Sequence, residues 1–169
     1  MLFAVACLFA GAFGALHNEI SYTVSSEYFT QFKFHQFNID DSLSNRVGAS
    51  VVGWHASWWM GIVIGIVLIP VGLVIRGPSQ YFWGMIRVFA VVTATTLIVG
   101  LVALAVAYLT IGSESAGEVK LYGNKVIDDV AFQRAGTMHN FSYLGGMFGI
   151  ITGALSIYWR CCCQTEQQR

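Results

Sequence analysis

The chain has 169 residues, which is the usual length of one domain. Hydrophobic residues make up 56% of it and charged residues 11%, against roughly 45–50% and about 25% in soluble globular domains. Nine basic and nine acidic side chains balance to a net charge of zero. This balance excludes the basic surface of a nucleic-acid-binding protein, and we expect no nucleic-acid partner. The composition predicts a single integral-membrane domain over residues 1–169, with the lipid bilayer as its main surroundings.

Long uncharged stretches predict where the chain crosses the membrane. Residues 56–75, 88–112 and 141–159 contain no Asp, Glu, Lys or Arg, and a membrane helix needs about 20 mostly apolar residues. With their flanks they predict spans at about 54–75, 84–112 and 139–160. Residues 1–16 are short for a span, but no Lys or Arg precedes the apolar run as in a signal peptide. We interpret them as a first span, with a signal peptide as the alternative, and predict an all-α fold, a four-transmembrane-helix bundle.

The distribution of basic residues predicts the orientation of the four spans. An even number of spans places both termini on one side of the membrane. The short segments on that side contain a dense set of basic residues, whereas the loops 17–53 and 113–138 are longer and contain most of the acids. Basic residues near span ends favour the cytoplasm, so we expect both termini there. The four basic residues concerned are Arg76, Arg87, Arg160 and Arg169.

The two longer loops predict a small cap on the outer face. Residues 20–24 alternate with period two and predict a short strand, and 28–37 predict either a strand or an interfacial helix. Residues 119–126 predict a β-hairpin that turns at Gly123 and Asn124. The many aromatic side chains of the first loop are typical of an interfacial belt, with a recognition surface as the alternative. Within the second span, Pro70 predicts a kink.

Small residues recur at helical spacing in the predicted spans. Because lipid provides no hydrophobic drive between helices, such residues let helix backbones approach closely. Packing within one bundle and docking of another subunit are both consistent with this pattern. The predicted packing glycines are Gly61, Gly65, Gly100, Gly145, Gly149 and Gly153.

Histidines at the outer ends of three spans form the one group of side chains in the sequence that could bind a metal or cofactor. His17 ends the first span, His55 begins the second and His139 begins the fourth, and Glu19 lies close to the first of them. Imidazole and carboxylate groups suit a transition metal such as Zn, Cu or Fe. His17 and Glu19 share one metal only if their segment is extended, because positions i and i+2 do not share a helix face. We rank a structural hydrogen-bond network above a metal site, and we rank a haem site below the metal site.

Three consecutive cysteines, Cys161, Cys162 and Cys163, follow the last span. Cysteines beside the membrane on the cytoplasmic side are candidates for acylation, and reduced thiols without a role are the alternative.

The remaining chemistry is mostly absent from the sequence. No span has an ionisable residue near its middle, which argues against ion-coupled transport, and no catalytic motif is present. We therefore expect a non-catalytic accessory or scaffold subunit that packs against larger membrane partners or against itself. A metal- or cofactor-binding membrane protein is the alternative, and a passive pore is the second alternative.

Overall fold

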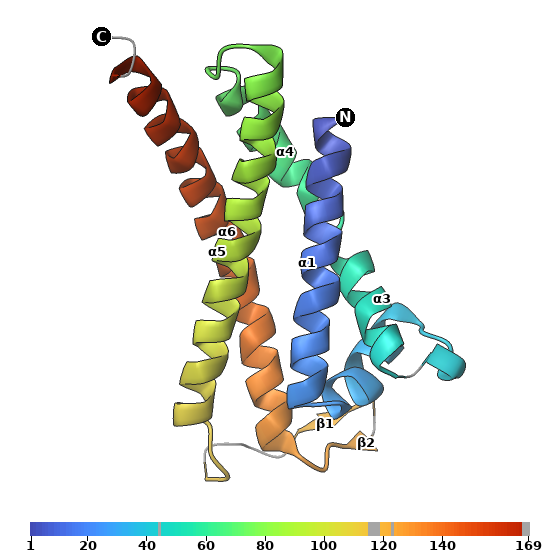
Figure 1. Ribbon diagram of the computed structural model, residues 1–169. Helices are drawn as coiled ribbons and strands as arrows, with labels where there is room; N and C mark the ends of the chain where they lie inside the picture. The colour runs from blue at the N-terminus through green and yellow to red at the C-terminus, as the bar shows by residue number, and fades with distance from the viewer. Residues whose placement is uncertain (44, 115–118, 123, 167–169) are drawn as a thin grey trace.

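A computed structural model describes residues 1–43, 45–114, 119–122 and 124–166, and it is mainly helical (Figure 1). Three helices are long and apolar enough to cross a membrane: α1 (Leu2–Val24), α5 (Pro78–Thr110) and α6 (Asp129–Glu166). Two further helices, α3 (Arg46–Ser57) and α4 (Met60–Gly72), pass the same test only as a pair, bent by 43°. The structure thus fits an integral membrane protein with three candidate spans, or up to four if the bent pair is one span.

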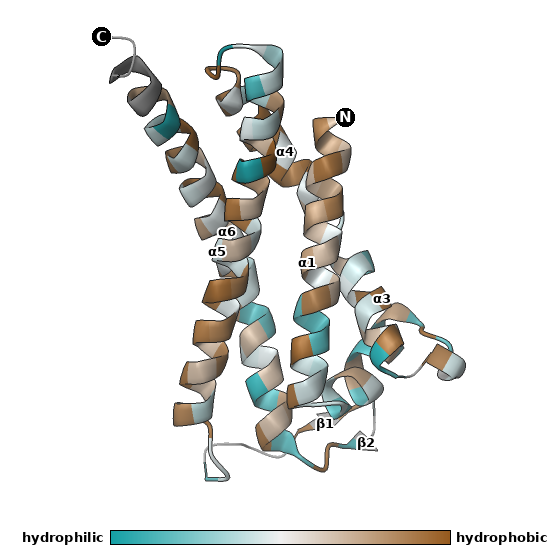
Figure 2. Cartoon of the chain, viewed as in Figure 1, coloured by the Kyte–Doolittle hydropathy of each residue, from teal (hydrophilic) through white to brown (hydrophobic). Residues whose placement is uncertain are grey.

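The chain passes repeatedly between two ends of the structure. Both termini and the turn between α4 and α5 lie at one end, and the segments that follow α1 and α5 lie at the other (Figure 1). The end with the termini contains Arg76, Arg87 and Arg160, and we call it the arginine end. The opposite end contains His17 and His139, and we call it the histidine end. Figure 2 shows hydrophilic residues on α1 and α6 towards the histidine end, and mostly apolar ribbon on the half of α5 towards that end.

The first helix is longer than the sequence predicts. We expected a span over 1–16 followed by a strand over 20–24, but α1 continues without interruption to Val24, so the strand prediction is wrong. The hydroxyls of Ser21 and Thr23 donate to the carbonyl oxygens of His17 and Glu19, one turn earlier. The period-two pattern therefore reflects polar side chains that bond to their own helix rather than a half-buried strand.

The second predicted span, 54–75, is broken rather than continuous. The break lies at Trp58 and Trp59, between α3 and α4, and not at Pro70. The amides of Gly61 and Ile62 donate to carbonyl oxygens three residues earlier, which tightens the backbone at the break. The proline lies two residues before the end of α4, where it removes one helical hydrogen bond without interrupting the helix.

The segments at the histidine end are helical where the sequence left two alternatives open. Residues 28–37 contain a π-helical turn, η1 (Phe29–Lys33), and a short helix, α2 (Phe34–Phe37), so the helical alternative is correct. A 3-10 turn, η2 (Asp41–Leu43), leads to α3. The predicted hairpin forms between β1 (Lys120–Leu121) and β2 (Asn124–Lys125). Leu121 pairs with Asn124, so Asn124 lies in the strand and not in the turn.

Two apolar clusters hold these elements together. The cluster nearer the arginine end joins α1, α4, α5 and α6. The aromatic cluster at the histidine end joins the η1 and α2 segment to α3, the hairpin region and the start of α6. The buried members of the first are Ala6, Leu68, Ile75, Met85, Val88, Phe89, Val92 and Ile157. Those of the aromatic cluster are Tyr28, Phe29, Phe34, Ala49, Val52, Val126, Phe132 and Ala135.

Candidate functional site

A polar network connects α1, α3 and α6 at the histidine end. His17 and Asn18 are each 4% exposed. The Nε2 atom of His17 lies 2.8 Å from the hydroxyl oxygen of Ser142, and its Nδ1 lies 3.4 Å from Oδ1 of Asn18. The same Oδ1 lies 3.1 Å from Nε2 of His139. Asn18 also donates from Nδ2 to the backbone oxygen of Ala49 on α3, at 3.0 Å. One amide side chain therefore joins three helices.

Helical spacing and a glycine bring these side chains together. His139 and Ser142 are three residues apart on α6, and residues at this spacing share a helix face. On α5, Gly100 faces this pair, and a Cβ at that position would lie 2.7 Å from the Ser142 hydroxyl oxygen. The absence of a side chain at Gly100 thus leaves the space in which His17 meets Ser142. The sequence predicted Gly100 as a packing residue, and the structure places it against this polar network.

The His139 ring is held on all sides. Its Nδ1 lies 3.0 Å from the backbone oxygen of Ala135, so both ring nitrogens face oxygen atoms. Its centroid lies 4.6 Å from that of His17, edge to face, and 4.7 Å from that of Tyr28. Burial raises the pKa of Tyr28, and the nearby Tyr143 raises it further. Tyr28 is therefore a neutral phenol that packs against the imidazole.

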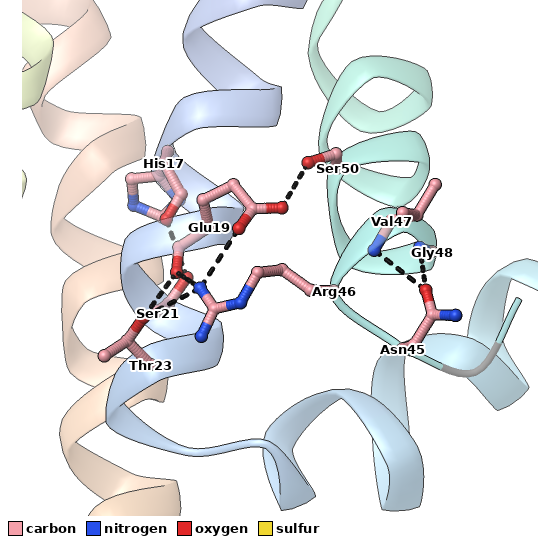
Figure 3. Close-up of polar contacts among 9 residues, drawn as sticks. All are labelled: His17, Glu19, Ser21, Thr23, Asn45, Arg46, Val47, Gly48 and Ser50. Atoms are coloured by element: carbon pink, nitrogen blue, oxygen red, sulfur yellow. Dashed lines mark hydrogen bonds and ion pairs between the residues drawn. The ribbon is translucent and has the colours of Figure 1, made fainter.

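The structure does not bring His17, Glu19 and His139 together on one side of α1. The segment 17–19 is helical and not extended, so the side chains of His17 and Glu19 point to different sides of α1 (Figure 3). Glu19 instead accepts hydrogen bonds from the hydroxyl of Ser50 and the guanidinium of Arg46 on α3, the second at 3.1 Å. Within the described ranges, no three His, Cys, Asp or Glu side chains are placed to hold a metal ion.

The same geometry argues against the haem alternative. Two histidines that ligate one haem lie on opposite faces of the porphyrin. The rings of His17 and His139 are in direct contact, and each of their nitrogens already has an oxygen within 3.4 Å. No porphyrin fits between them. The other two histidines lie outside this network: His55 is exposed, and His35 packs against Tyr122 with ring centroids 5.2 Å apart.

The network forms one end of a cavity of about 290 Å³ between the helices. This volume is near the lower end of the range for small-molecule sites, roughly 300–1,000 Å³. Along α1, the cavity wall changes from Ala6, Phe9 and Phe13 to His17 and Asn18. Asn18 lies twelve positions after Ala6 on the helix, a rise of about 18 Å at 1.5 Å per residue. The cavity is therefore elongated along α1, apolar towards the arginine end and polar towards the histidine end.

The helices opposite α1 repeat this change in polarity. Their apolar contributions include Met60 and Ile64 on α4 and Phe89 and Val92 on α5, and the polar contributions come from α3, α5, α6 and the η1 and α2 segment. The polar lining residues beyond the network are Lys33, Gln36, His55, Ser57, Thr93, Thr96 and Tyr143. His55 thus lines the cavity although it joins no metal-binding group. None of the described lining residues is an Asp or Glu.

Lys33 provides the positive charge of the cavity. Its ammonium donates to Oε1 of Gln36 at 3.0 Å and lies 4.5 Å from the ring centroid of Phe32. Among the described residues, the one ion pair joins Arg46 to Glu19, so Lys33 has no carboxylate partner there. Burial lowers the pKa of Lys33. A cation in such surroundings is stabilised by an anion or a strong hydrogen-bond acceptor.

The predicted packing glycines lie at contacts within the chain. Gly61 lies against the backbone of α1 at Cys7, and Gly65 against the ring of Phe3. Gly145 and Gly149 face the α5 backbone at Thr96 and Val92, and Gly153 faces side chains of α4 and α5. A contact that the sequence did not predict joins Gly14 to Gly53, where a Cβ on either residue would overlap the carbonyl oxygen of the other.

Among the predicted acylation candidates, Cys161 is half-buried at the end of α6 and packs against the apolar cluster near the arginine end, whereas Cys162 is exposed. The side chain of Cys163 lies outside the described residues. The acylation of these thiols stays a prediction.

Comparisons with known proteins add no assignment: no family model matches the sequence, and no curated protein or solved structure matches the chain.

Proposed function

We propose that this protein binds a single-chain amphipathic molecule with an acidic headgroup, such as a long-chain carboxylic acid, in the cavity between its helices. The observation that carries the proposal is the polarity change along the cavity. Apolar side chains line it for several turns of α1, and imidazole, amide, hydroxyl and ammonium groups line its histidine end. An elongated ligand with one polar end matches this distribution, because each part of the ligand meets a wall of its own polarity.

The charges of the lining favour an acid over a neutral headgroup. Lys33 contributes an ammonium that has no carboxylate partner among the described residues, and none of the described lining residues is acidic. A carboxylate bound there would accept a charge-assisted hydrogen bond from the partly buried ammonium, and such bonds are stronger than those between neutral groups. A neutral ester of the same chain length would occupy the apolar part without this bond.

We also propose that α3 and α4 together make one broken span. The chain then crosses the membrane four times as a bundle, and the histidine-end segments form a cap. The arginine end would face the cytoplasm, because Arg76, Arg87 and Arg160 cluster near the span ends there. Broken helices at membrane depth are tolerated where they are packed in protein or line a cavity. The residues at this break support that interpretation, since Ser57, Trp59 and Met60 line the cavity.

The accessory-subunit role expected from the sequence stays a prediction. The glycines that would dock a partner already face neighbouring helices of the same chain. A partner would therefore contact the lipid-facing side chains, such as Leu101 and Ile151.

The test compares oleic acid with methyl oleate as probes for the purified protein in mild detergent. We expect the acid to bind in one-to-one ratio and the ester to bind at least about tenfold more weakly, since a charge-assisted bond is lost. Lys33→Gln should weaken binding of the acid to a similar degree, whereas Arg76→Gln, which removes a cation outside the cavity, should not.

A second pair of variants tests the location of the ligand. Ala10→Phe places a ring in the cavity and should abolish binding of oleic acid, whereas Ala4→Phe places the same ring on the exposed side of α1. Equal binding of acid and ester would contradict the acidic headgroup. Unchanged binding by Ala10→Phe would contradict the site itself.

A further inference from the structure

A second, separate pocket lies between α5 and α6 at the arginine end and has a volume of about 550 Å³. Its walls are almost entirely apolar and include Val88 and Val91 on α5 and Leu155 on α6. Arg87 and Arg160 are also among its lining residues. The pocket therefore combines an apolar groove with two arginines at its border, a chemistry distinct from that of the cavity at the histidine end.

The two arginines are placed on facing sides of the two helices. Gly84 precedes Arg87 by one helical turn on α5, and residues at this spacing share a face. A Cβ on Gly84 would lie 3.1 Å from Nη1 of Arg160, so the guanidinium of Arg160 lies over this glycine. Gly84 thus lets the side chain of Arg160 reach the α5 face that contains Arg87.

Neither guanidinium is neutralised within the described part of the chain. The ion pair found there joins Arg46 to Glu19 at the other end of the molecule. Two uncompensated positive charges on adjacent helices repel each other, and a dianionic or monoanionic group between them relieves the repulsion. Phosphate oxygens match the forked donors of guanidinium, which bind them in bidentate fashion.

The position of the two arginines along the helices corresponds to the level of lipid headgroups. The uncharged stretch of α5 begins at Val88, directly after Arg87, and that of α6 ends at Trp159, directly before Arg160. Because these helices run in opposite directions, both arginines mark the same boundary of the apolar layer (Figure 1). The exposed indole rings of Trp83 and Trp159 lie at the same boundary, as is usual for interfacial tryptophans.

We infer that this pocket binds an anionic phospholipid. The headgroup phosphate lies between the guanidinium groups of Arg87 and Arg160, and one acyl chain lies in the groove between α5 and α6, against Val91 and Leu155. Basic pockets between membrane helices bind anionic lipid headgroups in this manner. The inference is independent of the ligand proposed for the cavity at the histidine end, because the two sites share no lining residue.

The test uses native mass spectrometry of the protein released from nanodiscs that contain phosphatidylglycerol and phosphatidylcholine in equal amounts. We expect the wild-type protein to retain one phosphatidylglycerol. The double variant Arg87→Gln/Arg160→Gln should retain it at least about tenfold less, since each arginine contributes to the attraction. Arg76→Gln removes the same charge from the same end but not from the pocket, and should retain the lipid as the wild type does.

Two further measurements keep the inference falsifiable. If the double variant does not fold, Arg87→Gln alone is used, because Arg87 is exposed and its removal leaves the apolar contacts intact. Thermal unfolding in detergent with added phosphatidylglycerol or inorganic phosphate then separates the two sources of the anion. A rise in melting temperature with the lipid alone supports the inference. An equal rise with inorganic phosphate, or equal lipid retention by the arginine variants and the wild type, would overturn it.

Discussion

Asn18 and His139 are 121 positions apart in the sequence, yet Oδ1 of Asn18 and Nε2 of His139 lie 3.1 Å apart between α1 and α6. The amide nitrogen of the same Asn18 donates to Ala49 on α3. In the apolar interior of a membrane protein, a polar group without a partner is costly, so both atoms of this amide are committed to holding helices together. The main role of the network is therefore to hold the helices together, and it also forms the polar wall of the cavity.

Substitution of Asn18 should destabilise the protein. Asn18→Ala removes the side-chain hydrogen bond to the Ala49 carbonyl and the oxygen atom next to Nε2 of His139, and we expect a loss of about 1–2 kcal/mol in the free energy of unfolding. Unfolding by sodium dodecyl sulfate in mixed micelles measures this quantity. Asn140→Ala serves as the control, because Asn140 is exposed on the same end of α6. Equal losses in the two variants would show that the network contributes nothing.

Close packing of α1 against α3 should depend on Gly14 and Gly53. A methyl group on either residue would overlap the carbonyl oxygen of the other, so Gly14→Ala and Gly53→Ala should each destabilise by about 1–3 kcal/mol. Gly146→Ala is the matched control, since a Cβ there has no atom within 4 Å, and it should be neutral or stabilising by up to about 1 kcal/mol. Thermal unfolding of the three variants tests the prediction, which fails if the control is the most damaging of the three.

The titration of Lys33 should make the free energy of unfolding depend on pH in the alkaline range. Burial lowers the pKa of Lys33 in the folded state below the ordinary value of 10.5. The unfolded state therefore binds more protons between these two values, and the free energy of unfolding rises as the pH rises through this window. Lys33→Met lacks this contribution, so the wild type should gain stability relative to the variant between pH 7 and the upper limit of the window. A constant difference across this range would contradict the prediction.

The carboxylate of Glu27 should order the start of α6. It accepts hydrogen bonds from the backbone amides of Ile127 and Asp128, at 3.1 and 2.8 Å. Glu27→Gln keeps the shape but removes the charge from these bonds, so we expect faster hydrogen exchange at both amides. Glu114→Gln alters an exposed carboxylate elsewhere at the same end and should leave the exchange unchanged. Protection that is equal in all three proteins would remove the assigned role.

Composition and uncharged stretches predicted the membrane class and the approximate positions of the apolar helices, because both depend on local hydrophobicity. The extent of α1 and the break at Trp58 and Trp59 were missed. The extent of α1 depends on Ser21 and Thr23, whose hydroxyls bond to carbonyl oxygens of the same helix. The break depends on tightening of the backbone at a site that contains no proline. Local pattern does not encode either feature.

The candidate site was predictable in part. Helical spacing indicated that His17 and His139 face other helices. The arrangement of His17 and Glu19 around one metal required an extended segment at 17–19, whereas that segment is helical. Lys33 was not among the predicted site residues, since it lies in η1, whose fold against the long helices depends on the aromatic cluster. No signal within the sequence indicated that its ammonium lines the cavity.

Photolabelling with a long-chain acid that has a diazirine in its chain tests most directly whether the cavity is a ligand site. Phe9 and Phe13 line the cavity, whereas Leu8 and Leu16 lie on the exposed side of the same helix, 57% and 53% exposed. Peptide mapping should find adducts on Phe9 and Phe13 that an excess of unlabelled oleic acid suppresses. Adducts confined to Leu8 and Leu16, unaffected by that excess, would show that the acid meets only the lipid-facing surface and would contradict the proposed site.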